Sequence, residues 1–195
     1  MREKLTPQNT SAVMIDMQQK LMPPMENRSG VTERTAYLLR CLAELGIPVI
    51  VTQQYTRGLG DTETALMEAA KAEAVFDKIT YSCYQDDAIR DYWEKSGRKN
   101  ILIWGVEAHI CVQQTALDLV SEGYRVYVIC DCTDSRNSYD REIAFRRMEQ
   151  QGIVLTTSES VVYELLERAG TDLFRRISRL TKEAPLFREG AVHEG

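Results

Sequence analysis

Cys111 is a residue whose type and position could support catalysis. It lies in the stretch IWGVEAHICVQQTALDLV (103–120), in which an apolar run ends at Gly105 and a new helix is expected to begin. In the first turn of a helix, free amide groups and the positive end of the helix dipole favour a thiolate, which can attack a carbonyl carbon. A cysteine at this position can also be a small apolar core residue. Position alone leaves both interpretations open.

A nucleophilic thiol needs a base within reach and groups that hold the developing negative charge. Asp16 directly follows the apolar run SAVMI (11–15), so its carboxylate is expected at the end of a strand. Lys78, in the stretch FDKITYSCY, would add a positive charge that steadies this carboxylate and lowers the pKa of the cysteine. Taken singly, Asp16 could instead cap a loop, and Lys78 could be a surface lysine.

The elements that must position these residues follow an alternating pattern. Amphipathic segments of helix length end at Gly46, Gly123 and Gly152, and β-rich runs lie between them. This alternation predicts an α/β fold with a parallel sheet that helices cover on both faces. The expected strands are 11–15, 48–52, 74–76, 101–104, 125–130 and 153–157, and the expected helices are 32–45, 111–122, 139–151, 159–169 capped by Ser158, and 171–182.

In open α/β sheets, ligands bind beyond the carboxyl ends of the strands. The polar residues expected at this edge are Asp16, Gln53 to Tyr55, Asp77 and Lys78, 105–111, and Asp131 with Cys132.

Composition narrows the function classes. The chain has 195 residues, 44% hydrophobic and 27% charged, which suits one globular domain over 1–195. No apolar run approaches the ~20 residues that span a bilayer, so we expect no membrane partner. The net charge of −5 and the scattered basic pairs offer no stripe for nucleic acid. An odd number of cysteines, five, and an N-terminus without a signal-peptide pattern indicate a cytoplasmic protein.

The sequence predicts neither a cofactor nor a metal. The glycines of GLG (58–60) lack the rest of a dinucleotide fingerprint, and a histidine cluster cannot form from His109 and His193. The pair Cys130 and Cys132 could hold a soft metal or form a redox couple, but alternation along a strand gives the same spacing.

Several motifs resemble a known family. The stretch VMIDMQ, the DK after the short third strand, and WGVEAHICVQQTALDLVSEGYRVYVICDC are similar in order and spacing to isochorismatase-like cysteine hydrolases, from about residue 9 to 166. The loop TQQYTRGLG resembles the branch of isochorismatase domain-containing proteins. The resemblance implies a three-layer α-β-α fold with a six-stranded parallel sheet of order 3-2-1-4-5-6. The sequence pattern itself predicts the C-terminal helices over 158–182.

The resemblance also implies roles for individual residues. It makes Asp16, Lys78 and Cys111 a catalytic triad, with a cis peptide between Val106 and Glu107. The backbone amides of Glu107 and Cys111 would then form the oxyanion hole. Candidate pocket residues are Gln54, Tyr81 and Trp104.

The activity implied is cysteine-dependent hydrolysis of a small amide, carbamoyl or related acyl substrate through a thioester. Gln53, Gln54 and Tyr55 stand where the nicotinamidase branch has metal ligands, which argues against a metal and against nicotinamide. Two alternatives stay open: a non-enzymatic ligand-binding or redox-sensing protein, and a vinyl-ether hydrolase of the isochorismate type, which the presence of the cysteine disfavours.

Two further expectations concern self-association and the reactivity of the thiols. The apolar residues of the C-terminal segment predict a homo-oligomer, because they exceed what one sheet edge covers: Val161, Val162, Leu165, Phe174 and Ile177. We expect the Cys111 thiolate to be populated near neutral pH and the pKa of Cys41 to be raised, with Cys83 and Cys132 partly exposed.

Overall fold

The computed structural model describes residues 4–186 and contains one six-stranded parallel sheet of order β3-β2-β1-β4-β5-β6. This order confirms the one that the resemblance implied. The strands are β1 (Thr10–Ile15), β2 (Val49–Gln54), β3 (Ala74–Lys78), β4 (Asn100–Gly105), β5 (Arg125–Thr133) and β6 (Val154–Thr156). All six expected strands are present, and β5 runs three residues further than expected, to Thr133.

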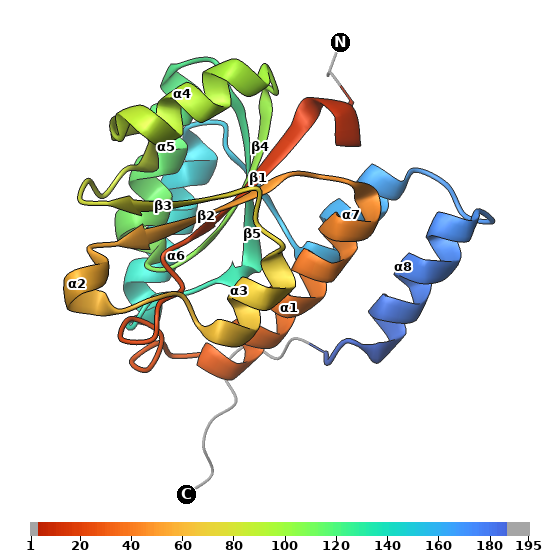
Figure 1. Cartoon of the computed structure of the whole chain (residues 1–195), viewed down its shortest axis with the longest axis horizontal. Coiled ribbons are helices and arrows are strands. Elements are labelled where there is room, and N and C mark those ends of the chain that lie inside the picture. Colours follow the sequence, from red (N-terminus) through yellow and green to blue (C-terminus); the bar gives the residue numbers. More distant parts are fainter. Residues whose placement is uncertain (1–3, 187–195) are drawn as a thin grey trace, which may run out of the picture.

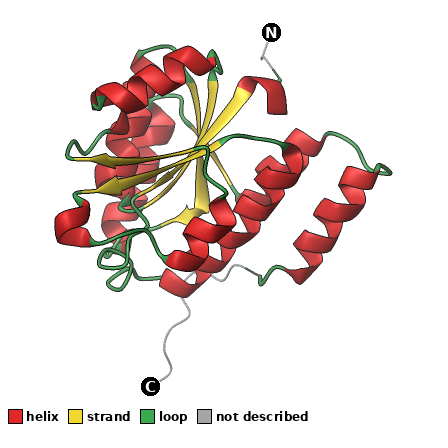
Figure 2. Ribbon diagram, viewed as in Figure 1, coloured by secondary structure: helices red, strands yellow, loops and turns green. Residues whose placement is uncertain are grey.

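Helices cover both faces of the sheet (Figure 1). On one face lie α1 (Arg28–Leu45), α3 (Thr64–Ala70), α7 (Ser158–Leu166) and α8 (Asp172–Glu183). On the other face lie α4 (Asp87–Ser96), α5 (Gln113–Ser121) and α6 (Ser138–Gln150). Figure 2 shows the strands as a central layer between these groups, with the short α2 (Thr56–Leu59) beyond the end of β2. The three-layer α-β-α prediction is confirmed.

Side chains alternate between two core clusters along each strand, because successive residues of a strand point to opposite faces. On β1, Met14 packs toward α1, whereas Val13 and Ile15 pack toward α5. On β4, Trp104 belongs to the α1 cluster and Ile103 to the α5 cluster. The α5 cluster also contains Cys111, so this face carries the candidate nucleophile.

Some helices depart from those predicted. The sequence pattern did not indicate α3 and α4, which bury only two residues each. α4 nevertheless has a clear start and stop: the Asp86 side chain accepts hydrogen bonds from the amides of Ala88 and Ile89, and Gly97 ends the helix. At α7 the N-cap is Thr157 rather than Ser158, because the Thr157 hydroxyl accepts from the amide of Ser160.

The C-terminal apolar residues are covered within the chain. Val161, Val162 and Ile177 are fully buried and Leu165 nearly so, and all of them pack in the α1 cluster. Phe174 is partly buried against the same cluster. The apolar surface on which the oligomer prediction rested is therefore absent from the described residues. Among these residues, no helix is long and apolar enough to cross a bilayer.

Gly105, the last residue of β4, lets the backbone pass very close to the end of β1. Its φ is 128°, and a Cβ atom there would lie 2.0 Å from the carbonyl oxygen of Ile15. The next residue, Val106, donates its amide to that same oxygen at 3.0 Å. Only glycine permits this contact, which brings the start of the 106–111 segment next to Asp16.

Candidate active site

Asp16, directly after β1, and Lys78, the last residue of β3, form a fully buried ion pair. The Lys78 Nζ atom lies 2.7 Å from Oδ2 of Asp16, and neither side chain is exposed. The second carboxylate oxygen, Oδ1, accepts the Thr52 hydroxyl at 2.8 Å. Asp16 has a φ of 52°, a left-handed conformation that aspartate tolerates better than most residues, and it turns the chain at the end of the strand.

Lys78 has acceptors for all of its ammonium protons. Besides Asp16, its Nζ donates to Oε1 of Gln54 at 2.6 Å and to the carbonyls of Thr80 and Tyr81 at 3.2 and 3.3 Å. Burial is the largest single influence and opposes the positive charge. The charge and hydrogen bond of Asp16, together with smaller contributions from Cys83 and Cys111, outweigh it, so the pKa of Lys78 is raised above its ordinary value. Lys78 is thus a fixed cation that holds Asp16, with no ammonium proton left over.

Cys111 lies in a π-helical turn, Ala108–Val112, directly before α5. Such turns are rare and occur often at functional sites. The thiol is 6% exposed. Burial raises the pKa of Cys111, the charge of Asp16 and a hydrogen bond to it raise it further, and Lys78 opposes them only in part. The expectation of a thiolate at neutral pH is therefore wrong: the resting form is the thiol, beside a carboxylate that can accept its proton.

The peptide bond between Val106 and Glu107 is cis. The segment that follows is held by the loop after β5: the amide of Ala108 donates to the carbonyl of Asp134 at 2.8 Å. The Glu107 carboxylate accepts the amide of Arg136 at 3.1 Å. These contacts fix the backbone between the cis bond and Cys111.

Sequence reasoning missed Asp134 and its partners. Asp134 is fully buried, and Oδ1 accepts from Arg141 Nη1 and from the amide of Ser135, each at 2.8 Å. Its other oxygen, Oδ2, accepts the amide of Asn27 at 2.7 Å. The sequence does show a carboxylate two residues beyond Cys132. The strand was expected to end at residue 130, however, so the loop that follows β5, which begins with Asp134, was expected to start three residues too early.

The candidate pocket residues divide into two groups. Gln54 contacts Lys78 through Oε1, and its Nε2 donates to the carbonyl of Ile79 at 3.0 Å. Tyr81 contributes its carbonyl to Lys78, while its side chain is 57% exposed at the rim. Trp104 is different: it is fully buried in the α1 cluster, on the face of the sheet opposite Cys111. Trp104 is a core residue, because alternation along β4 turns it away from the site.

The other thiols also differ from expectation. Cys83 and Cys132 are fully buried rather than partly exposed, and Cys130 is the partly exposed cysteine. Burial raises the pKa of Cys41 to about 11, as predicted for its place on an apolar helix face. All five cysteines are free thiols.

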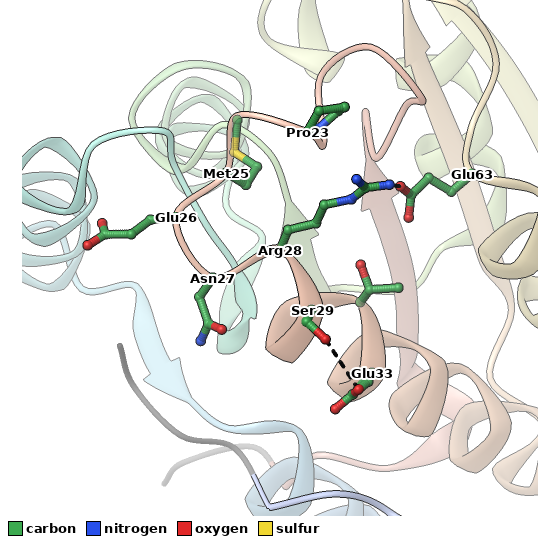
Figure 3. A pocket seen from close by; sticks show the side chains of 9 residues that line it. Pro23, Met25, Glu26, Asn27, Arg28, Ser29, Glu33 and Glu63 are labelled. Atoms are coloured by element: carbon green, nitrogen blue, oxygen red, sulfur yellow. Dashed lines mark hydrogen bonds and ion pairs between the residues drawn. The ribbon is translucent and has the colours of Figure 1, made fainter. Parts of the chain in front are cut away.

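A pocket of about 630 Å³ opens beside the first turn of α1 (Figure 3). Charged side chains line it, including Glu26 and Glu33, and Arg28 pairs with Glu63 at 2.7 Å. Asp16, Lys78 and Cys111 do not line this pocket, so it is separate from the candidate active site. Within residues 4–186, no group of three or more histidine, cysteine or acidic side chains is arranged to hold a metal ion.

Comparisons with known proteins agree with the observed fold. The isochorismatase domain model matches residues 10–160. Isochorismatase domain-containing protein 1 of Salmo salar is 36% identical over 91% of this chain, which spans only 62% of that relative's length. The MAR1 ribonuclease of Caenorhabditis elegans is 32% identical, with a TM-score of 0.88 over 97% of each chain. The YcaC gene product of Escherichia coli, an octameric hydrolase of unknown specificity, has a TM-score of 0.84 at 21% identity, over 94% of this chain and 97% of its own.

Proposed function

The chain belongs to the isochorismatase family of hydrolases, and from that premise we propose that it hydrolyses a small amide, carbamoyl or related acyl compound through a thioester on Cys111. The observation that carries this proposal is the neutral, nearly buried thiol beside the Asp16 carboxylate, which Lys78 and Thr52 hold in place. A neutral thiol that must give up its proton needs an adjacent base, and Asp16 supplies one.

In the first half of the reaction, Asp16 takes the proton of Cys111 as the sulfur attacks the substrate carbonyl. The carbonyl oxygen becomes an oxyanion, and the amides of Glu107 and Cys111 hold it. Asp16 then gives its proton to the departing amine as the C–N bond breaks. The product is an acyl thioester on Cys111 and a neutral amine or ammonia.

In the second half, Asp16 removes a proton from water, and the hydroxide adds to the thioester carbonyl. The same two amides hold the oxyanion. As the C–S bond breaks, the acid leaves, and Cys111 regains a proton from Asp16. Lys78 acts in both halves through Asp16, because its ammonium protons already have partners in the protein.

A redox-sensing role is less well supported than hydrolysis. Cysteines that sense oxidants have a low pKa and are accessible to solvent. Cys111 has a raised pKa and is 6% exposed, so it has the opposite properties. Oxidation of a sensor thiol also does not require a carboxylate that two donors hold in place, as Thr52 and Lys78 hold Asp16.

RNA hydrolysis is a second candidate, because a relative at 32% identity is a ribonuclease. Cleavage of a phosphodiester concentrates negative charge on the phosphate, which free cationic donors usually stabilise. The cation at this site, Lys78, is buried and saturated with acceptors. The geometry therefore favours a neutral acyl substrate over RNA.

The deciding experiment is a screen of small amides and carbamoyl compounds for ammonia release, with a labelled RNA as a parallel substrate. We expect turnover of at least one amide, loss of that turnover in Cys111→Ala, and no effect of EDTA. RNA cleavage that disappears in Cys111→Ala, without amide turnover, would replace the proposal. EDTA-sensitive turnover restored by zinc would contradict the metal-free mechanism.

The homo-oligomer also stays a proposal, on a different surface. Three large apolar side chains lie exposed near the ends of β2 and β3: Tyr55 at 53%, Ile79 at 81% and Tyr81 at 57%. The edge strand β3 adds Val75, which is 48% exposed. A second copy that covers these residues would also shield the approach to Lys78. The YcaC gene product has a similar fold and is octameric, which supports an oligomer of this chain.

The free state of all five cysteines supports the expected cytoplasmic location. Disulfides form in oxidising compartments and are rare in the reducing cytosol. A protein with five unpaired thiols, four of them buried, suits a reducing compartment.

A further inference from the structure

Thr52 is joined to Asp16 by two hydrogen bonds, one from its backbone and one from its side chain. It pairs with Ile15 in the register of β1 and β2, and its carbonyl oxygen accepts the amide of Asp16 at 3.1 Å. Its hydroxyl donates to Oδ1 of Asp16 at 2.8 Å. Thr52 is fully buried, so water does not compete for the carboxylate at this position.

The direction of this hydroxyl is fixed by a third residue. The Cys83 thiol donates to the Thr52 oxygen, with Sγ and Oγ1 3.8 Å apart. A hydroxyl has one proton, so Thr52 accepts from Cys83 and donates its own proton to Asp16. The amide of Cys83 donates to the Thr115 hydroxyl at 2.9 Å, on α5, four residues after Cys111. The hydrogen bonds therefore run from Cys83 through Thr52 to Asp16, and the amide of Cys83 is held by Thr115 on α5.

Other buried threonines of the sheet use their hydroxyls differently. The Thr10 hydroxyl donates to the carbonyl of Thr6 at 2.6 Å, and the Thr133 hydroxyl donates to the carbonyl of Ile129 at 2.8 Å. These bonds satisfy local backbone, as buried hydroxyls commonly do. The Thr52 hydroxyl is directed instead at a carboxylate 36 positions away in sequence.

The two donors on Asp16 lie on different oxygens. Thr52 occupies Oδ1 and Lys78 occupies Oδ2, so the plane of the carboxylate is fixed from both sides. The protons of Thr52 and Lys78 also compensate part of the negative charge that Cys111 experiences. Loss of either donor would change both the orientation of the base and its effect on the thiol.

From this geometry we propose that Thr52 is a positioning residue for Asp16, and that the Cys83 thiol orients the Thr52 hydroxyl. The inference rests on the proposed function, since it assigns Thr52 a role in presenting the base to Cys111. It adds two residues, Thr52 and Cys83, that act through Asp16.

The test measures the rate of Cys111 alkylation by iodoacetamide against pH, with peptide mapping to follow this one thiol. Thr52→Val removes the donor and keeps the shape of the side chain. We expect the rate at fixed pH to fall on the order of 3- to 10-fold, because the thiol then faces a less compensated carboxylate; residues of one hydrogen-bond network couple with this magnitude. Thr52→Ser restores the hydroxyl and should restore the wild-type profile.

A double-variant cycle separates positioning from packing. If Thr52 acts through Asp16, Thr52→Val should change the profile in the wild-type background and leave it unchanged in the Asp16→Asn background. An equal shift in both backgrounds would show a packing effect and overturn the inference. Thr10→Val, a buried threonine at the opposite end of β1, is the matched control and should keep the wild-type profile.

Failure of this inference is distinguishable from failure of the proposed function. If Thr52→Val matches wild type while Asp16→Asn changes the profile, Thr52 has no positioning role and the catalytic pair stands. If neither variant changes the profile, Asp16 does not act on Cys111, and both proposals fall. Should Thr52→Val not fold, Cys83→Ala removes the preceding donor, and a profile identical to wild type would overturn the role of Cys83.

Discussion

The ammonium of Lys78 lies 2.7 Å from the carboxylate of Asp16, and both side chains are wholly removed from solvent. Removing two charges from water is costly, and the cost is recovered only when the charges pair closely and their remaining hydrogen-bonding groups are satisfied. Both conditions hold here, because Thr52, Gln54 and two backbone carbonyls complete the pair.

Replacement of Lys78 by methionine should strongly destabilise the protein. Lys78→Met leaves the Asp16 carboxylate buried without its cation, which typically costs about 3–5 kcal/mol of unfolding free energy. Urea unfolding at pH 7 measures this loss. Lys95→Met is the control, because Lys95 pairs with Asp91 at 3.4 Å on the surface, where loss of an ion pair costs about 1 kcal/mol or less. Equal losses of unfolding free energy in the two variants would show that the buried pair stabilises the protein no more than a surface pair does.

Asp16→Asn should separate thiol reactivity from turnover. Burial and the charge of Asp16 both raise the pKa of Cys111, so removing the charge should increase the rate of Cys111 alkylation at fixed pH. Turnover should nevertheless be lost, since the amide cannot accept the thiol proton. Asp118→Asn, on α5, the helix that follows the π-turn, controls for a general change in charge. Slower alkylation of Cys111 in Asp16→Asn than in wild type would contradict the predicted effect of this charge.

The buried thiols should make the protein less stable in alkali. The pKa of Cys41 is raised from 9.0 to about 11 in the folded state, chiefly by burial. The unfolded chain then loses this proton before the folded protein does, so stability is intact below about pH 9 and falls as pH rises toward 11, at ~1.4 kcal/mol per pH unit for one group. Urea unfolding between pH 8 and 10.5 should show a shallower decline for Cys41→Ala than for wild type. Identical slopes would exclude Cys41 as a contributor.

Gly105→Ala should disrupt the site and the fold together. The added Cβ would lie 2.0 Å from the Ile15 carbonyl oxygen, at a φ of 128°. We expect a loss of at least ~3 kcal/mol in unfolding free energy, or no soluble protein, because backbone must move to relieve the contact. Gly123→Ala is the comparison: its φ is 81° with no atom near the new Cβ, so its cost should be about 1 kcal/mol. Thermal unfolding of the two variants measures the difference.

Ile79→Lys should weaken self-association. Ile79 is 81% exposed beside Tyr81, and a charge there would oppose burial against a second copy. Light scattering at micromolar concentration should give a mass above 22.3 kDa for wild type and a lower mass for the variant. Lys95→Met, a charge change on α4, should leave the assembly intact. A monomeric wild-type protein would refute the proposed oligomer.

Much of the architecture follows from sequence pattern. The β-rich runs and the helices that end at Gly46, Gly123 and Gly152 are local features, because strand and helix periodicity and glycine stops depend on neighbouring residues. Asp16 and Lys78 could be placed at strand ends for the same reason. The expected strand order came from the resemblance rather than from periodicity, and the structure has that order.

The sequence by itself thus determined the α/β fold class, the strands that lead to the candidate site, and the residue types Asp, Lys and Cys at their ends. The tertiary structure alone decided that burial raises the pKa of Cys111, that Trp104 faces away from it, and that the apolar residues of α7 and α8 pack in the α1 cluster. The role of Thr52 was likewise invisible in the sequence. Burial, charge and hydrogen-bond partners depend on groups that lie tens of residues apart in the chain, so they become defined only when the strands and helices pack against one another.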